Sequence, residues 1–131
     1  ALKNAKLVIA EVNARMPRTC GRTKIHLSQI DYLVETDQGL PNLHNEETNE
    51  AALAIGKNVA SLVEDGATLQ LGIGMIPNAV LASLKDKKDL GVHTEMFSDQ
   101  VVELSRLGVI NNSCKTVLPG KIAVSFAMGS Q

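Results

Sequence analysis

The chain has 131 residues, of which 44% are hydrophobic, 21% charged and 2% aromatic, and its formal net charge is −1. This length and composition suit one ordinary domain with a real core, and they argue against a disordered polyelectrolyte or a nucleic-acid binder. No apolar run approaches the roughly 20 residues of a membrane span, and the first residues are too polar for a signal peptide. We therefore expect a cytoplasmic protein without nucleic-acid or membrane partners.

The first forty residues carry strand patterns. The apolar, β-branched run 7–12 predicts a strand, and further short strands are expected at 25–27 and 31–36. Turn-forming residues at 38–42 precede a change of pattern, which places a domain boundary near residue 44.

From residue 46 the pattern becomes helical, with apolar positions at helical spacing between 52 and 63. A strand at 68–71 is followed by the tight loop 72–76, and Pro77 is expected at the first position of a helix.

The alternation then continues toward the end of the chain. A strand at 90–94 ends at Glu95, Ser98 can cap the next helix, and a last strand is expected at 122–127. This order predicts an α/β protein with a mostly parallel sheet and flanking helices.

Two features follow predicted strands and could carry chemistry. The loop glycines Gly72 and Gly74 would let a ligand approach the backbone, and the helix start behind them could hold an anion or oxyanion. Glu95 would share their crevice if the two strands are neighbours. Two other interpretations stay open. The loop could be a tight turn that needs its glycines for steric reasons alone, and Glu95 could be a solvent-exposed loop residue without a role in chemistry.

A dinucleotide-binding fingerprint is a further alternative. Residues 72–77 match the first two glycines of G-x-G-x-x-G, but Pro77 replaces the third. The interpretation of the chain as a nicotinamide-dependent oxidoreductase therefore has only weak support. Cys20 and Cys114 lack metal-ligand spacing; we expect buried or half-buried reduced thiols and no metal site.

Several linked motifs resemble the acetyl-CoA hydrolase/transferase family, and especially its 4-hydroxybutyrate and butyryl-CoA:acetate CoA-transferases. The resemblance is carried by Gly66-Ala67-Thr68-Leu69-Gln70-Leu71-Gly72-Ile73-Gly74, by His93-Thr94-Glu95-Met96, and by residues 10–13, 16–19, 21, 25–26, 28–31, 76–81, 87–92, 119–121 and 125–130. It implies the CoA-transferase fold and a fragment of a two-domain protein. Residues 1–44 would form the C-terminal part of the first α/β domain, and residues 45–131 would form the N-terminal half of the second, which carries the glycine loop and Glu95.

The resemblance also implies an activity and a set of site residues. Glu95 matches the family's nucleophile, and Ile73 matches the residue whose backbone N–H helps to form the oxyanion hole. Gly72, Gly74, Met75, Met128 and Gly129 match segments that bind CoA or substrate.

The implied reaction moves CoA between an acyl-CoA and a short carboxylic acid through a glutamyl-CoA thioester, with acetyl-CoA hydrolysis as the alternative. CoA is then a substrate, no cofactor is expected, and a homo-oligomer is expected. The 131 residues alone are expected to be inactive, since a second oxyanion donor lies on a later loop of the family; a non-catalytic fragment is the remaining alternative.

The chain departs from the family pattern at a few positions. Met75 stands where a small residue is usual, Ala14 replaces a frequent proline, and Arg22-Thr23 replaces an acidic-polar pair. The larger Met75 side chain could reshape the acyl pocket, so the acyl group used is left open.

Overall fold

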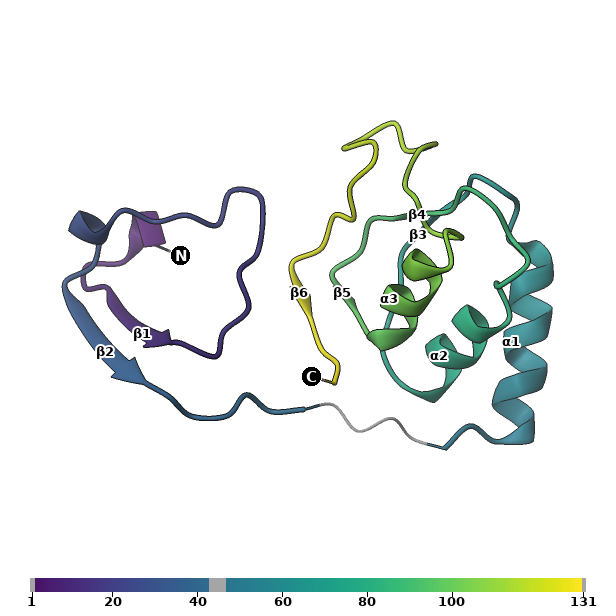
Figure 1. Ribbon diagram of the computed structural model, residues 1–131, viewed down its shortest axis with the longest axis horizontal. Coiled ribbons are helices and arrows are strands. Elements are labelled where there is room, and N and C mark those ends of the chain that lie inside the picture. Colours follow the sequence, from purple (N-terminus) through teal and green to yellow (C-terminus); the bar gives the residue numbers. More distant parts are fainter. Residues whose placement is uncertain (1, 43–46, 131) are drawn as a thin grey trace. The chain divides into compact units, whose positions relative to one another are not determined.

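The computed structural model describes residues 2–42 and 47–130 of the chain (Figure 1). The chain divides into two compact units, Ala1–Pro41 and Asn42–Gln131. The domain boundary predicted near residue 44 lies outside the described residues.

The first unit is built on two parallel strands, β1 (Ile9–Asn13) and β2 (Tyr32–Thr36), with Ile9 opposite Tyr32. The short 3-10 helix η1 (Leu2–Asn4) precedes them. The strand expected at 25–27 is wrong, because the 3-10 helix η2 (Leu27–Gln29) begins there. Its cap explains the difference: the His26 ring accepts the Ser28 N–H at 3.2 Å, so this backbone group is satisfied locally.

The second unit alternates helices and strands as the sequence predicts. The order is α1 (Glu50–Leu62), β3 (Thr68–Leu69), α2 (Met75–Ala82), β4 (Gly91–Val92), β5 (Met96–Phe97), α3 (Asp99–Arg106) and β6 (Phe126–Ala127). β3 pairs with β4 and β5 with β6, both in parallel, and the parallel bridge between His93 and Ala123 links the two pairs. The α/β class with parallel strands is thus confirmed, although most strands are shorter than expected.

Two helix starts differ in detail from the sequence interpretation. The helical pattern in the sequence begins at residue 46, which lies outside the described residues. α1 itself begins at Glu50, because the Asn49 side chain caps it and accepts the Ala52 N–H at 2.8 Å. Pro77 is the third residue of α2 and not the first. The position is tolerated because the first turn of a helix has no intrahelical acceptor for its N–H groups.

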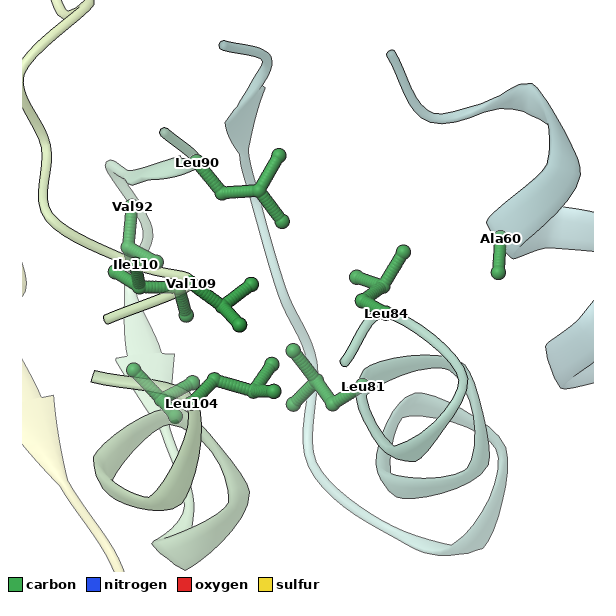
Figure 2. Packing of buried hydrophobic residues seen from close by; sticks show 9 residues of the cluster. Ala60, Leu81, Leu84, Leu90, Val92, Leu104, Val109 and Ile110 are labelled. Atoms are coloured by element: carbon green, nitrogen blue, oxygen red, sulfur yellow. The ribbon is translucent and has the colours of Figure 1, made fainter. Parts of the chain in front are cut away.

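One apolar core fills the second unit. Figure 2 shows Leu81 of α2, Leu84 in the turn after it and Leu104 of α3 directed into the same interior as Val92 and Ile110. The other members of the cluster are Ala60, Leu90, Val101 and Val109. α2 lies between α1 and α3 and contacts both (Figure 1).

α1 approaches α2 closely because small residues form the contact. Ala52, Gly56 and Ala60 recur every four residues and are buried. A Cβ added at Gly56 would lie 2.6 Å from the backbone oxygen of Ala79 in α2, so only glycine fits this contact.

Two buried polar side chains bind the backbone of β4. Asn112 accepts the Val92 N–H at 2.9 Å, and the Lys115 ammonium donates to the carbonyls of Val92 at 2.7 Å and Lys121 at 2.6 Å. Lys115 is 6% exposed, and burial lowers its pKa from 10.5. In residues 2–42 and 47–130, no helix is both long and apolar enough to cross a membrane.

Candidate active site

The glycine loop connects the end of β3 to the start of α2. Gly74 caps α2 with φ of +107°, a conformation that side-chain-bearing residues rarely adopt. Gly72 is exposed, whereas Ile73 and Met75 are half-buried. Within the described part of the chain, no hydrogen-bond acceptor faces the N–H of Ile73. This N–H is therefore available to a bound group.

Glu95 lies between β4 and β5, since a short strand follows it before the helix begins. The sequence interpretation had only a loop there. The residue is exposed, but its backbone is held: the Glu95 carbonyl accepts the N–H groups of Ser125 at 3.0 Å and Phe126 at 3.2 Å. Its carboxylate thus projects from a fixed backbone position at the carboxyl end of β4.

Thr94 joins the segment of Glu95 to the glycine loop. Its hydroxyl accepts the Leu71 N–H at 2.9 Å and lies 2.8 Å from the Leu71 carbonyl, to which it can donate. Leu71 directly precedes the loop, so the loop starts beside the residue before Glu95. The condition left open by the sequence is met, since β3 and β4 are paired neighbours.

Ser98 makes a second connection between the same two segments. It occupies the N-cap position of α3, as predicted, but its side chain caps no N–H of that helix. Instead its hydroxyl donates to the Asn78 side-chain oxygen at 2.9 Å, and Asn78 lies just beyond the glycine loop in α2.

Residues 128–130 follow β6 and are anchored on the neighbouring segment. The Met128 N–H donates to the Phe97 carbonyl at 3.0 Å, and the Ser130 N–H lies 3.0 Å from each Asp99 carboxylate oxygen. A Cβ added at Gly129 would collide with the Asp99 carboxylate, so a larger residue here requires the Asp99 side chain to move.

All seven site residues predicted from the sequence follow the carboxyl ends of parallel strands in the second unit. They belong to three neighbouring segments: Gly72, Ile73, Gly74 and Met75 after β3, Glu95 after β4, and Met128 and Gly129 after β6. Ligands of open parallel sheets bind at this edge.

Four residues that organise this edge were missed: Thr94, Ser98, Asn78 and Asp99. The sequence held one signal for them, namely that hydroxyl side chains flank Glu95 at one position before and three positions after it. Their partners lie about 20 residues away along the chain or more, and periodicity does not reveal such partners.

A hollow of about 430 Å³ lies next to this edge, lined by Asp99, Gln100, Val102, Glu103, Arg106 and Ser130. Neither Glu95 nor the glycine loop lines it, so it is not the crevice that the sequence predicts. Among residues 2–42 and 47–130, no group of three or more His, Cys, Asp or Glu side chains could hold a metal ion. Cys20 and Cys114 are free and both exposed, which corrects the expectation of buried or half-buried thiols.

Known proteins resemble this chain over its whole length. It is 59% identical to 4-hydroxybutyrate coenzyme A transferase of Clostridium kluyveri over 131 residues, 100% of the chain and 30% of the relative. It is 45% identical to succinyl-CoA:cyclohexane-1-carboxylate CoA transferase of Geobacter metallireducens over 130 residues, 99% of the chain and 30% of the relative. No family model matches the chain.

Solved structures agree with these relatives. A 4-hydroxybutyrate CoA-transferase from Porphyromonas gingivalis matches with a TM-score of 0.93 and 45% identity, over 98% of this chain and 33% of that one. RipA from Yersinia pestis matches with a TM-score of 0.92 and 40% identity, over 98% of this chain and 30% of that one. The chain spans about 30% of the length of the curated relatives, and over that span its sequence and its fold are similar to those of coenzyme A transferases.

Proposed function

We propose that this chain is part of a CoA-transferase that moves CoA between an acyl-CoA and a short carboxylic acid, with Glu95 as its nucleophile. The observation that carries the proposal is the placement of Glu95 beside the glycine loop, at the carboxyl edge of parallel strands. Relatives whose names include 4-hydroxybutyrate, succinyl-CoA and butyryl-CoA support the substrate class.

The proposed reaction begins when a Glu95 carboxylate oxygen attacks the thioester carbonyl carbon of the acyl-CoA. The oxyanion that forms would accept the free N–H of Ile73, and the CoA thiolate leaves to give an acyl-glutamyl anhydride. The thiolate then attacks the glutamyl carbonyl, which releases the first carboxylate and leaves a glutamyl-CoA thioester. The acceptor acid reverses these steps and regenerates the Glu95 carboxylate.

The remaining site residues have a supporting part in this proposal. Gly72 and Gly74 would let the thioester approach the loop backbone, and Met75 would border the acyl group at the first residue of α2. Met128 and Gly129 would border CoA, since their segment is held against Asp99 at the same edge.

We also propose that these residues belong to a longer two-domain protein of the CoA-transferase fold. The chain spans about 30% of its relatives, and apolar side chains of both units are exposed. In the first unit these include Ile9 and Leu33 of the two-stranded sheet, and in the second Ile55 and Leu62 of α1. An isolated two-stranded sheet is marginally stable, so further chain or a second copy would cover it. A homo-oligomer and a cytoplasmic location remain predictions.

The test of the proposal is a CoA-transfer assay on the full-length protein and its Glu95→Gln variant. Acetyl-CoA is supplied with and without an acceptor acid such as butyrate. We expect acyl-CoA exchange that requires the acceptor and falls by at least about 10³-fold in the variant. Release of CoA without acceptor would assign the hydrolase alternative, and equal activity of the variant would remove Glu95 from the chemistry.

A further inference from the structure

The parallel ladder between β3 and β4 stops just before the predicted site. Its last backbone bond runs from the His93 N–H to the Leu69 carbonyl at 3.0 Å. Beyond it the backbone pairing of the two segments ends: the Thr94 N–H donates to the Ala123 carbonyl at 2.9 Å, and within the described residues Leu71 has no backbone partner on this strand. No backbone bond therefore fixes the spacing between the glycine loop and Glu95.

The Thr94 side chain replaces those missing bonds. Its one hydroxyl accepts the Leu71 N–H and has the Leu71 carbonyl at 2.8 Å, so both backbone groups of Leu71 meet the same oxygen. Thr94 is 7% exposed, and its β-branched side chain has few rotamers. A buried hydroxyl in this position fixes where the loop begins relative to Glu95.

Ser98 fixes the other end of the loop in the same manner. A serine at an N-cap usually accepts an N–H of its own helix, and here that bond is given up for Asn78. Ser98 is 2% exposed, so the Ser98–Asn78 bond is shielded from water. Leu71 and Asn78 therefore bracket the loop, as Thr94 and Ser98 bracket Glu95.

We propose that Thr94 and Ser98 are positioning residues, which hold the two ends of the glycine loop at a fixed spacing from Glu95. This inference rests on the proposed function, because it concerns the approach of the Ile73 N–H to an oxyanion formed at Glu95. Neither hydroxyl touches substrate in this role. A displacement of about 1 Å between such groups can lower a rate about 10²-fold.

The test uses the full-length protein with Thr94→Val, which keeps the side-chain shape, and Thr94→Ser, which keeps the hydroxyl. We expect Thr94→Val to lower kcat about 10²-fold with KM for the acyl-CoA changed less than about threefold. Thr94→Ser should stay within about threefold of wild type, and Ser98→Ala should lower kcat about tenfold. Hydrogen exchange of a peptide that covers Leu71 to Met75 should be faster in Thr94→Val.

Two control variants separate positioning from general stability. Ser83→Ala removes a half-buried hydroxyl that donates to the Ala79 carbonyl at 2.9 Å, away from Glu95. Ile110→Val trims the core beside Leu90, at the opposite end of β4, and lowers Tm. Both should keep wild-type kcat.

The outcomes distinguish this inference from the proposed function. If wild type transfers CoA in a Glu95-dependent way but Thr94→Val has wild-type kcat, or if Thr94→Ser loses as much as Thr94→Val, the positioning role is wrong. If Ile110→Val has the same Tm as Thr94→Val and lowers kcat as much, the effect of Thr94→Val is general destabilisation, and the positioning role is wrong. If wild type shows no Glu95-dependent transfer, the proposed function fails, and unchanged exchange at Leu71 in Thr94→Val would then overturn the positioning role separately.

Discussion

The contact of α1 with α2 at Gly56 gives a quantitative prediction for Gly56→Ala. A new Cβ would lie 2.6 Å from the Ala79 oxygen and 2.7 Å from its carbonyl carbon, whereas ordinary contacts begin at 3.4 Å. The obstacle is backbone, so α1 must move by about 0.8 Å, the difference between 3.4 and 2.6 Å. Overpacking costs about 1–3 kcal/mol, and because backbone atoms cannot rotate away we expect the upper part of that range, about 2–3 kcal/mol, while replacing glycine with alanine in a helix returns about 1 kcal/mol.

The net expectation is a loss of about 1–2 kcal/mol in the local stability of α1. Native-state hydrogen exchange measures it directly, because exchange of the α1 amides should become about 5–30 times faster. Asn58→Ala is a matched control: residue 58 is exposed on the same helix, so alanine should slow exchange through helix propensity alone. The reasoning would be refuted if Gly56→Ala slowed exchange as the control does, since the helices would then not be in close contact.

Three further changes test other parts of the structure. Gly129→Ala should displace the Asp99 carboxylate and speed exchange of the residue 130 amide, with the unfolding free energy changed by less than about 0.5 kcal/mol; an unchanged amide would contradict the contact. Gly74→Ala should cost about 1–3 kcal/mol in urea unfolding, because φ of +107° with ψ of −175° is a conformation essentially restricted to glycine, whereas Gly72→Ala, with an ordinary contact at 3.6 Å, should cost less than about 0.5 kcal/mol; equal costs would oppose this assignment. Burial lowers the folded pKa of Lys115 below 10.5, so the unfolded state binds more protons between the two pKa values, and stability relative to Lys115→Met should rise as the pH approaches 10.5; a fall in urea midpoints with rising pH would contradict this sign.

Local patterns in the sequence predicted much of the second unit. The apolar spacing of α1, the loop at Gly72 to Gly74 and the alternation of strands with helices were all visible, because burial imposes a period on side chains. The alternation predicted parallel strands, but whether β3 and β4 are neighbours was left open, and the structure shows that they pair. These features place Glu95 and the glycine loop at one edge.

Contacts between distant residues could not be predicted in the same way. β3 stops at Leu69 because the Thr94 hydroxyl takes over its next bonds, and β5 forms because the Glu95 carbonyl holds residues 125 and 126. The strand expected at 25–27 was lost to the His26 cap. Each case depends on one side chain or carbonyl that competes for backbone groups, and composition and periodicity do not report this competition.

The most direct test of the central claim is the intact mass of the full-length protein after exposure to an acyl-CoA, beside a Glu95→Ala variant. The proposed mechanism predicts a CoA-sized adduct on the wild type, which peptide mapping places at Glu95 and which the variant lacks. An adduct on another residue, or an equal adduct on the variant, would contradict the assignment of Glu95 as the nucleophile.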